Sequence, residues 1–201
     1  MRYKKSAISA AQIVDAAKRV IARQGYGQTS LKDIADEAGM SKGAIHYHYP
    51  TKEALVAKVL QSATDAVAER TLAAWLAGGS DPMTAMRSAV RELWRVRSTG
   101  SDEVAVISNL LAQALHDEGL RPQLAEYFRL ASAQTSEHLV TAMAGWGLRP
   151  RVAPELIPRL LLGLLDGLAL QVFVEPEVIE PDELVKAVEL FAGALFEVAP
   201  A

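Results

Sequence analysis

The fold of this chain is decided by residues 30–55, SLKDIADEAGMSKGAIHYHYPTKEAL. Their apolar residues recur at spacings of three and four, which indicates short helices rather than strands. Gly39 follows the first helix and can adopt the left-handed backbone of a tight turn. Ser41 can cap a second short helix, and Pro50 prevents that helix from continuing. A short helix, a turn and a second short helix form the helix-turn-helix pattern, whose second helix enters the major groove of DNA.

Helical spacing also continues on both sides of this stretch. No segment alternates between apolar and polar residues as a half-buried strand would. Ser9 and Gln12 have the spacing of a capping box, so we expect the first helix to begin at Ser9. The sequence therefore predicts an all-α chain of about nine helices, over residues 9–24, 31–38, 42–49, 52–77, 82–97, 102–116, 121–144, 153–174 and 181–198.

The composition is typical of a globular protein. The chain has 201 residues, half of them hydrophobic, and no cysteine. These values exclude a mainly disordered chain, a disulfide scaffold and a thiolate zinc site. Residues 156–174 are the most apolar stretch, but they contain Arg159 and Asp166, so we interpret them as a buried helix rather than a membrane span. No apolar signal-peptide segment follows the basic N-terminus. We expect a soluble, cytoplasmic protein without membrane contact.

The charge is distributed unevenly. Residues 1–60 carry ten Lys and Arg and five acidic residues, a net charge of +5, whereas the remainder has a net charge of −8. A basic N-terminal part on an acidic body favours a polyanion as the partner of the N-terminal part. The alternative is an ordinary solvated face.

Two ordered motifs lie in the N-terminal part, GYGQTSLKDIA at residues 25–35 and AGMSKGAIHYHYPTKEAL at residues 38–55. They resemble the turn into the second helix and the recognition helix of the TetR family of bacterial transcriptional regulators. The resemblance covers about residues 9–60. His46 stands where the family usually has Tyr, and Tyr49 where Phe is common. The change at His46 leaves the DNA-binding interpretation intact but affects which operator sequence is recognised.

The resemblance implies a domain organisation and a function. Residues 1–51 would form a three-helix DNA-binding domain, and residues 52–201 a helical bundle for ligand binding and dimerisation. The chain would be a regulator, most simply a repressor, that binds a palindromic operator in double-stranded DNA as a homodimer and is released by an unknown small-molecule effector. The alternative is a helical module that binds a small molecule or a protein and has lost DNA recognition. We expect no enzyme, because the residues show no catalytic constellation.

The candidate DNA contacts are the polar, small and aromatic residues of the motif. Lysines can neutralise phosphates, Gly43 permits close approach of the backbone, and Ala44 can touch a thymine methyl group. The alternatives are solvated lysines, a tolerated glycine, a packed Tyr47 and side chains that only cap a helix. The candidates are Thr29, Ser30, Lys42, Gly43, Ala44, His46, Tyr47, His48 and Lys52.

The two histidines of the recognition helix also invite a metal interpretation. Residues two apart on a helix point about 200° away from each other, so His46 and His48 cannot share one ion. We expect no metal and no cofactor.

The C-terminal body is where the resemblance implies a ligand cavity and a dimer interface. The candidate ligand-binding residues are Trp75, Met86, Trp94, Leu110, Gln113, Phe128, His138, Met143 and Phe173. The alternatives are ordinary core packing, a satisfied core histidine at His138, and a solvated stripe of Asn109, Gln113 and His116. The candidate interface residues on the last two helices are Leu160, Leu164, Leu168, Val188, Phe191 and Leu195. The alternative for these is the core of a monomeric bundle.

Overall fold

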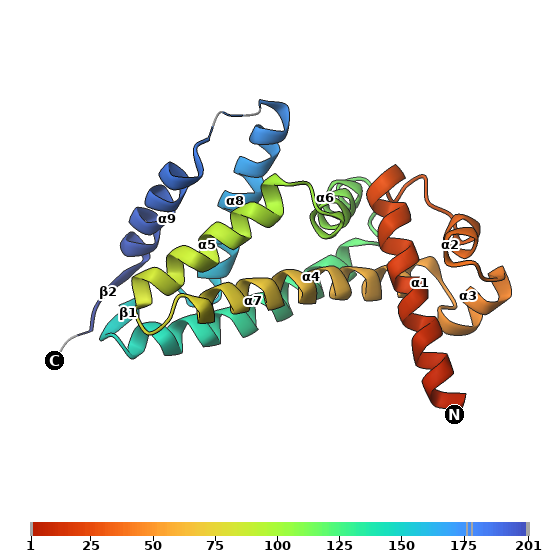
Figure 1. The fold of residues 1–201 in the computed structure, drawn as a ribbon, viewed down its shortest axis with the longest axis horizontal. Helices are drawn as coiled ribbons and strands as arrows, with labels where there is room; N and C mark the ends of the chain where they lie inside the picture. Colours follow the sequence, from red (N-terminus) through yellow and green to blue (C-terminus); the bar gives the residue numbers. More distant parts are fainter. Residues whose placement is uncertain (1, 176, 178, 200–201) are drawn as a thin grey trace. The chain divides into compact units, whose positions relative to one another are not determined.

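The computed structural model describes residues 2–175, 177 and 179–199, with the side chains at 2–8, 82, 131, 134, 135, 137, 138 and 192 left out of the description. Helices dominate this part of the chain, as the sequence predicts (Figure 1). The elements are α1 (Arg2–Gln24), α2 (Leu31–Ala38), α3 (Lys42–His48), α4 (Lys52–Ala77), α5 (Pro82–Ser98), α6 (Asp102–Ala114), α7 (Arg121–Ala144), β1 (Leu148–Pro150), α8 (Leu156–Val174), α9 (Pro181–Leu195) and β2 (Phe196–Val198).

Two expectations about element boundaries are wrong. Helix α1 begins at Arg2, so the capping box expected at Ser9 does not start it. Residues 196–198, expected to end the last helix, instead form β2, which pairs antiparallel with β1 and places Arg149 opposite Glu197. The side chains of these two residues form an ion pair of 2.6 Å. Three-residue strands are too short to show an alternating pattern, and their pairing depends on a contact between distant segments.

The chain packs as two compact units, and each unit draws on two separate segments. Residues 1–68 and 100–127 form one unit, which we call the head unit, and residues 69–99 and 128–201 form the body unit. Helix α6 therefore belongs to the head unit, although it lies far from the motif in the sequence. The predicted boundary at residue 51 separates DNA binding from ligand binding and dimerisation. It is a division of function, not of packing, and it stays a prediction.

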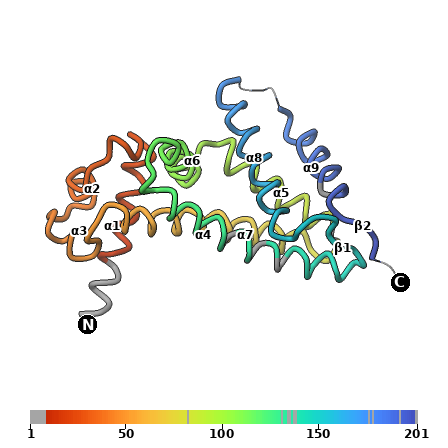
Figure 2. The backbone as a smooth tube through the Cα atoms, turned by 180° about the vertical axis from the view of Figure 1, so that it is seen from behind, coloured from red at the N-terminus to blue at the C-terminus, as the bar shows by residue number. Residues whose placement is uncertain are grey.

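The head unit is built around one apolar core. Ile13 and Ile21 of α1 are buried together with Ile45 of α3 and with Val106 and Leu110 of α6. Helix α6 contacts α1, and Figure 2 shows the two next to each other. Burial of these large side chains stabilises the unit by about 1.5–3 kcal/mol each, so α6 is an integral part of it.

The body unit contains two cores. Helix α5 packs against α8 and α9 through a cluster that includes Trp94, Leu165 and Val188. A second cluster joins Met143 of α7 to Ile157 of α8 and to Phe196 of β2. The short sheet thus closes the body unit at the end of α9.

Candidate nucleic-acid interface

The helix-turn-helix is held by local caps that the sequence predicts. Ser30 caps α2: its Oγ accepts from the Asp33 backbone N–H at 3.2 Å, and its own N–H donates to the Asp33 carboxylate at 2.8 Å. Gly39 adopts the left-handed conformation, with a φ of 64°, and closes the turn. Ser41 caps α3 by accepting from the backbone N–H of Ala44 at 3.2 Å. These caps satisfy backbone groups that the helix ends leave free, and they fix where α3 begins.

One face of α3 is turned to solvent. Ile45 is fully buried and anchors the helix, whereas Tyr47 is 79% exposed. Lys42, Gly43 and His46 are exposed as well. The Tyr47 ring meets the His48 ring edge to face, with 5.2 Å between the ring centroids. The structure therefore exposes four of the predicted contact residues of α3, with Tyr47 extended into solvent rather than packed, whereas Ala44 and His48 are half-buried.

The opposite face of α3 is anchored to α1. Tyr49 follows the helix, and its hydroxyl donates to the carbonyl oxygen of Ala10 at 3.5 Å. Burial raises the pKa of the Tyr49 hydroxyl above its ordinary value. Tyr49 thus packs inward.

Two predicted phosphate contacts have partners inside the chain. The Thr29 side chain is buried, and its hydroxyl donates to the carbonyl oxygen of Gly25 at 2.7 Å. The Lys52 ammonium donates to the carbonyl oxygen of Tyr26 at 2.8 Å and lies 3.8 Å from the centroid of the Tyr26 ring. Thr29 also does not cap α2, because Ser30 occupies that position.

Charges beside the recognition helix are partly paired. Arg19 and Arg23 of α1 form ion pairs with Glu37 of α2, at 2.7 Å and 3.2 Å. Hydrogen bonds from these two guanidinium groups hold the pKa of the Glu37 carboxyl below its ordinary value. The two arginines therefore fasten α2 to α1.

The predicted ligand-binding residues are divided between the two units and, within the body unit, between two cores. Leu110 is buried in the head unit, and the side chain of Gln113 lies against Gly27. Met86 packs in the same cluster as Trp94, whereas Met143 belongs to the other core of the body unit.

The other predicted ligand-binding residues differ in burial and in partners. Trp75 stacks on Trp146, with 6.4 Å between ring centroids. Phe173 is 86% exposed, and Phe128 is half-buried. The side chain of His138 lies outside the described residues. A single cavity lined by the predicted set therefore stays a prediction.

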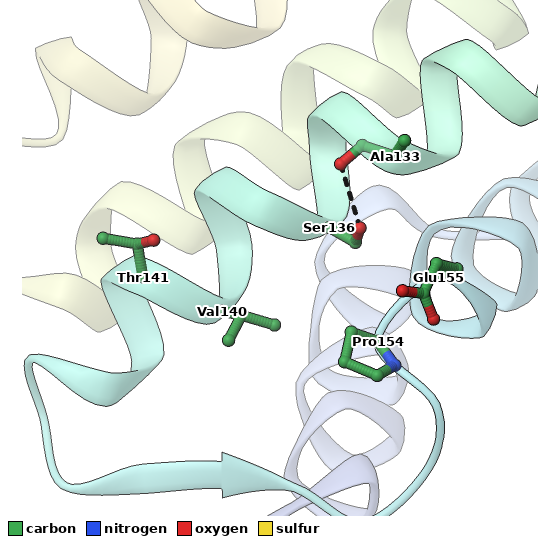
Figure 3. A pocket seen from close by; sticks show the side chains of 6 residues that line it. All are labelled: Ala133, Ser136, Val140, Thr141, Pro154 and Glu155. Atoms are coloured by element: carbon green, nitrogen blue, oxygen red, sulfur yellow. Dashed lines mark hydrogen bonds between the residues drawn. The ribbon is translucent and has the colours of Figure 1, made fainter.

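An open hollow of about 310 Å³ lies between the C-terminal half of α7 and the segment before α8. Figure 3 shows the Ser136 hydroxyl donating to the carbonyl oxygen of Ala133, with the Glu155 carboxylate nearby. The sequence does not predict this hollow, because its lining residues come from two separate segments. Its full lining is Ala133, Ser136, Val140, Thr141, Pro154 and Glu155.

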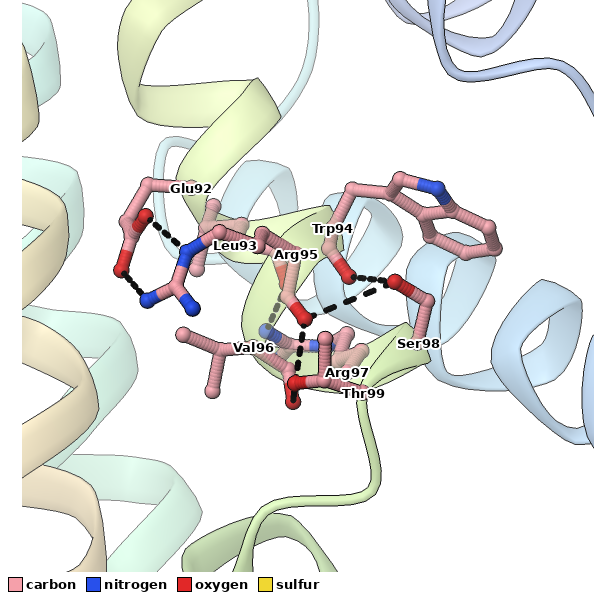
Figure 4. A network of polar contacts seen from close by, with 8 residues as sticks. All are labelled: Glu92, Leu93, Trp94, Arg95, Val96, Arg97, Ser98 and Thr99. Carbon is pink, nitrogen blue, oxygen red and sulfur yellow. Dashed lines mark hydrogen bonds and ion pairs between the residues drawn. The ribbon is translucent and has the colours of Figure 1, made fainter.

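The sequence analysis also missed an ion pair inside the body unit. Arg97 of α5 lies 2.6 Å from Asp166 of α8, and the Arg97 side chain is 8% exposed. Figure 4 shows Arg97 also donating to the carbonyl oxygen of Leu93 within α5. The available signal was Asp166 itself, an acidic residue within a run of leucines. Within the described residues, no three His, Asp or Glu side chains gather as metal ligands would.

The predicted interface residues on α8 and α9 are directed into the chain's own cores. Val188 and Leu195 are buried, and Leu160, Leu164, Leu168 and Phe191 pack against the two cores of the body unit. A different stripe is exposed on α8, at positions 163, 167, 170 and 174, and another on α9, at positions 187, 190 and 194. Leu160, Leu164, Leu168 and Phe191 are only half-buried, so the predicted interface stays a prediction.

Helix α8 is unusually apolar for its exposure. By length and composition alone it could cross a membrane, and 17% of the apolar stretch is buried inside the chain. The prediction that residues 156–174 form a buried helix is thus only partly met, because most of α8 is not buried within a single chain. A single helix of this kind is weak evidence for a membrane, because core and interface helices have the same composition.

The fold and the exposed recognition helix define a helix-turn-helix regulator, and comparison with known proteins gives the family. Residues 13–59 match the family described as bacterial regulatory proteins of the tetR family, and residues 82–197 match the C-terminal domain of BetI-type transcriptional repressors. The chain therefore belongs to the TetR family of transcriptional regulators, with a C-terminal domain of the BetI type.

Individual relatives agree with this assignment. The regulator TtgR of Pseudomonas putida is 33% identical over 84 residues, which are 42% of this chain and 40% of that protein. The nicotine-responsive repressor HdnoR of Paenarthrobacter nicotinovorans is 27% identical over 175 residues, or 82% of this chain and 84% of that protein. A transcriptional regulator from Rhodococcus sp. Rha1 has a similar crystal structure, with a TM-score of 0.73, 26% identity and coverage of 95% of this chain and 99% of that one. These relatives are transcriptional regulators and not enzymes.

Proposed function

We propose that this chain is a cytoplasmic, ligand-responsive repressor that binds a palindromic operator in double-stranded DNA as a homodimer. The observation that carries the proposal is the recognition helix α3, which is anchored by the buried Ile45 and presents the exposed Tyr47 on its other side. Tyr47 and the exposed Lys42 lie on one short helix, where they can reach base edges and phosphates of a duplex.

The proposed DNA contacts follow from exposure and chemistry. Lys42, at the start of α3, would neutralise a phosphate, and Ser30 would add a hydroxyl at the start of α2. Gly43 would allow the backbone to approach the duplex closely. Ala44, His46, Tyr47 and His48 would contact base edges or phosphates, since they lie on the accessible helix. Thr29 is buried, so its part in the proposal is to support the turn before Ser30.

The proposed dimer uses the exposed stripes of α8 and α9. Gly163 and Gly167 have open space where a side chain would lie, so another helix can approach closely at these positions. Leu170 of α8 and Leu190 of α9 are 63% and 78% exposed. A second copy buries this surface. A lipid bilayer is a poorer partner, because α8 also carries the charged Asp166 at its middle.

The proposed effector binds in the body unit. Binding would favour a conformation in which the two recognition helices no longer match successive major grooves, about 34 Å apart. Its effect on DNA affinity is limited by its differential affinity for the two conformations. The relative HdnoR is named as nicotine-responsive, which supports a small molecule as the class of effector here.

Selection of bound duplexes from a random DNA pool tests this proposal. We expect an enriched palindrome with half-sites one helical turn apart, and loss of the enrichment in Tyr47→Ala and Lys42→Ala variants that keep their helical content. Leu76→Ala is a suitable control, because Leu76 is exposed near the C-terminal end of α4 and belongs to the body unit. Sequence-independent binding, or none with a metabolite extract added, would instead favour a module that has lost DNA recognition.

A further inference from the structure

We infer that Lys52 is a positioning residue for DNA recognition rather than a phosphate contact: its ammonium fastens the turn between α1 and α2 to the start of α4. This inference rests on the proposed DNA-binding function, because it assigns a role within that site. It concerns only residues of the head unit.

The Lys52 ammonium makes two contacts with one residue. Its Nζ donates to the Tyr26 carbonyl oxygen at 2.8 Å and lies 3.8 Å from the centroid of the Tyr26 ring. The Tyr26 side chain is 6% exposed and belongs to the core of the head unit. A cation over an aromatic face is attracted by the ring, and more strongly where water is excluded. The ammonium is therefore directed into the chain, toward a fixed part of the core.

The turn that Lys52 holds is enclosed on its other side by α6. The Asn109 Oδ1 atom lies 3.1 Å from the place where a Cβ on Gly25 would be, and the Gln113 Oε1 atom lies 3.2 Å from the equivalent place on Gly27. Gly25 has a φ of 80°, which a residue with a side chain adopts only with strain. The sequence analysis weighed Asn109 and Gln113 as a solvated stripe, but the structure packs them on this turn.

The same turn leads directly into the recognition motif. The Tyr26 carbonyl oxygen accepts from the Thr29 backbone N–H at 3.1 Å as well as from Lys52. Thr29 precedes Ser30, the residue that caps α2. A change at Lys52 therefore reaches α2 through Tyr26, Thr29 and Ser30, and it reaches α3 through the turn at Gly39.

The electrostatic surroundings favour an internal role for the ammonium. Burial lowers the pKa of Lys52, although the carboxylates of Glu53, Asp117 and Asp33 act in the opposite direction. Burial also raises the pKa of Tyr26 to about 12. To contact a phosphate, the ammonium would have to leave both the carbonyl oxygen and the ring of Tyr26. Lys42 has no such requirement, because it is exposed at the start of α3.

The two roles predict different salt dependence of DNA binding. A lysine that neutralises a phosphate releases counterions, and its loss reduces the slope of log Kobs against log salt by about 0.9 per subunit. A positioning lysine instead sets the fraction of molecules whose recognition helix is placed to bind. Its loss reduces this competent fraction and lowers the affinity by the same factor at every salt concentration.

The test measures operator affinity by fluorescence anisotropy over a range of salt concentrations, with a duplex obtained by the selection described above. We expect Lys52→Met to weaken binding about ten-fold at every salt concentration, with the salt slope of the wild type. Lys42→Met is the matched control and should reduce the slope by about 0.9 per subunit. A slope reduced equally by Lys52→Met would overturn the inference while leaving the proposed function intact. If Lys42→Met and Tyr47→Ala both bind like the wild type, the proposed function itself fails.

Two further variants separate positioning from loss of folding. Lys52→Arg keeps a cation that can lie over the Tyr26 ring, so we expect its affinity to stay within roughly three-fold of the wild type. Tyr26→Leu removes the ring but keeps the carbonyl oxygen, so its contact with Lys52 is only partly lost. It should therefore weaken binding less than Lys52→Met does, again without changing the slope. The double variant should be no weaker than Lys52→Met alone, because loss of the ammonium already removes its contact with the ring. Additive losses, or an Arg variant as weak as the Met variant, would contradict the positioning role.

Discussion

Arg97 of α5 and Asp166 of α8 form an ion pair of 2.6 Å across the body unit, and its two partners differ in exposure. The Arg97 side chain is 8% exposed, whereas that of Asp166 is 40% exposed. The pair therefore places one charge inside the protein and leaves its counter-charge at the edge. A buried cation of this kind depends on its partner far more than a surface cation does.

Replacement of Asp166 should destabilise the body unit. We expect Asp166→Ala to lower the free energy of unfolding by about 2–3 kcal/mol, less than for a fully buried pair because Asp166 is partly solvated. Urea denaturation followed by circular dichroism measures this. Glu183→Ala is the control, since Glu183 pairs with Lys186 on the exposed side of α9, and its loss should cost about 0.5 kcal/mol or less. Equal losses in the two variants would show that Arg97 is solvated in solution.

If the exposed stripes of α8 and α9 form the dimer interface, one charged substitution in either stripe should weaken the dimer. We expect Leu170→Glu and Leu190→Glu each to raise the dimer dissociation constant about a hundred-fold or more, because two copies of each leucine lose their burial. Sedimentation equilibrium measures the change. Leu76→Glu is matched in exposure, at 68%, and should leave the dimer intact. Val188→Ala should lower the stability of the fold instead, because Val188 lies in the core of the body unit.

The link between α1 and α2 predicts a dependence of stability on pH. The pKa of Glu37 is lowered in the folded chain, mainly by the hydrogen bonds from Arg19 and Arg23. The stabilisation is therefore present above the pKa that Glu37 has in the unfolded chain, and it is lost as the pH falls through the lower, folded value. We expect Glu37→Gln to melt below the wild type at neutral pH, with the gap in Tm closing at acidic pH.

The two arginines provide the check on this pH dependence. A variant with Arg19→Gln and Arg23→Gln should reproduce the loss at neutral pH, and adding Glu37→Gln should cost nothing further. A gap in Tm that persists unchanged into acid would mean that the carboxylate is not the source of the stabilisation.

Substitution of Gly43 should change the stability of the fold and the affinity for DNA in opposite directions. The place for a Cβ on Gly43 is 3.8 Å from the Ser41 Oγ atom, an ordinary contact, so Gly43→Ala should stabilise α3 by about 0.5–1 kcal/mol. Operator affinity should nevertheless fall, because the added methyl group keeps the backbone away from the duplex. Thermal melting and anisotropy on the same protein test both effects. Unchanged affinity in a stabilised variant would mean that Gly43 is only a tolerated residue of the helix.

The sequence by itself determined the recognition motif. Ser30, Gly39, Ser41 and Pro50 act on neighbours within a few residues, through caps, a left-handed turn and a helix stop. Such signals do not depend on the rest of the fold, so the helices over residues 31–38 and 42–48 and the exposed side of α3 could be predicted closely. The same local character explains why residues 9–60 alone were enough to suggest the family, which the match over residues 82–197 then extends to the C-terminal domain.

Only the tertiary structure decided which faces are buried elsewhere. Helix α8 is apolar on nearly all sides, so its periodicity could not show that Leu164 and Leu168 pack inward while Leu170 is exposed. The residues around Lys52 do not show whether its ammonium contacts a phosphate or Tyr26. The sequence of α6 likewise does not show that this helix packs in the head unit. These features depend on contacts between segments far apart in the chain, whose partners are set by packing and not by spacing.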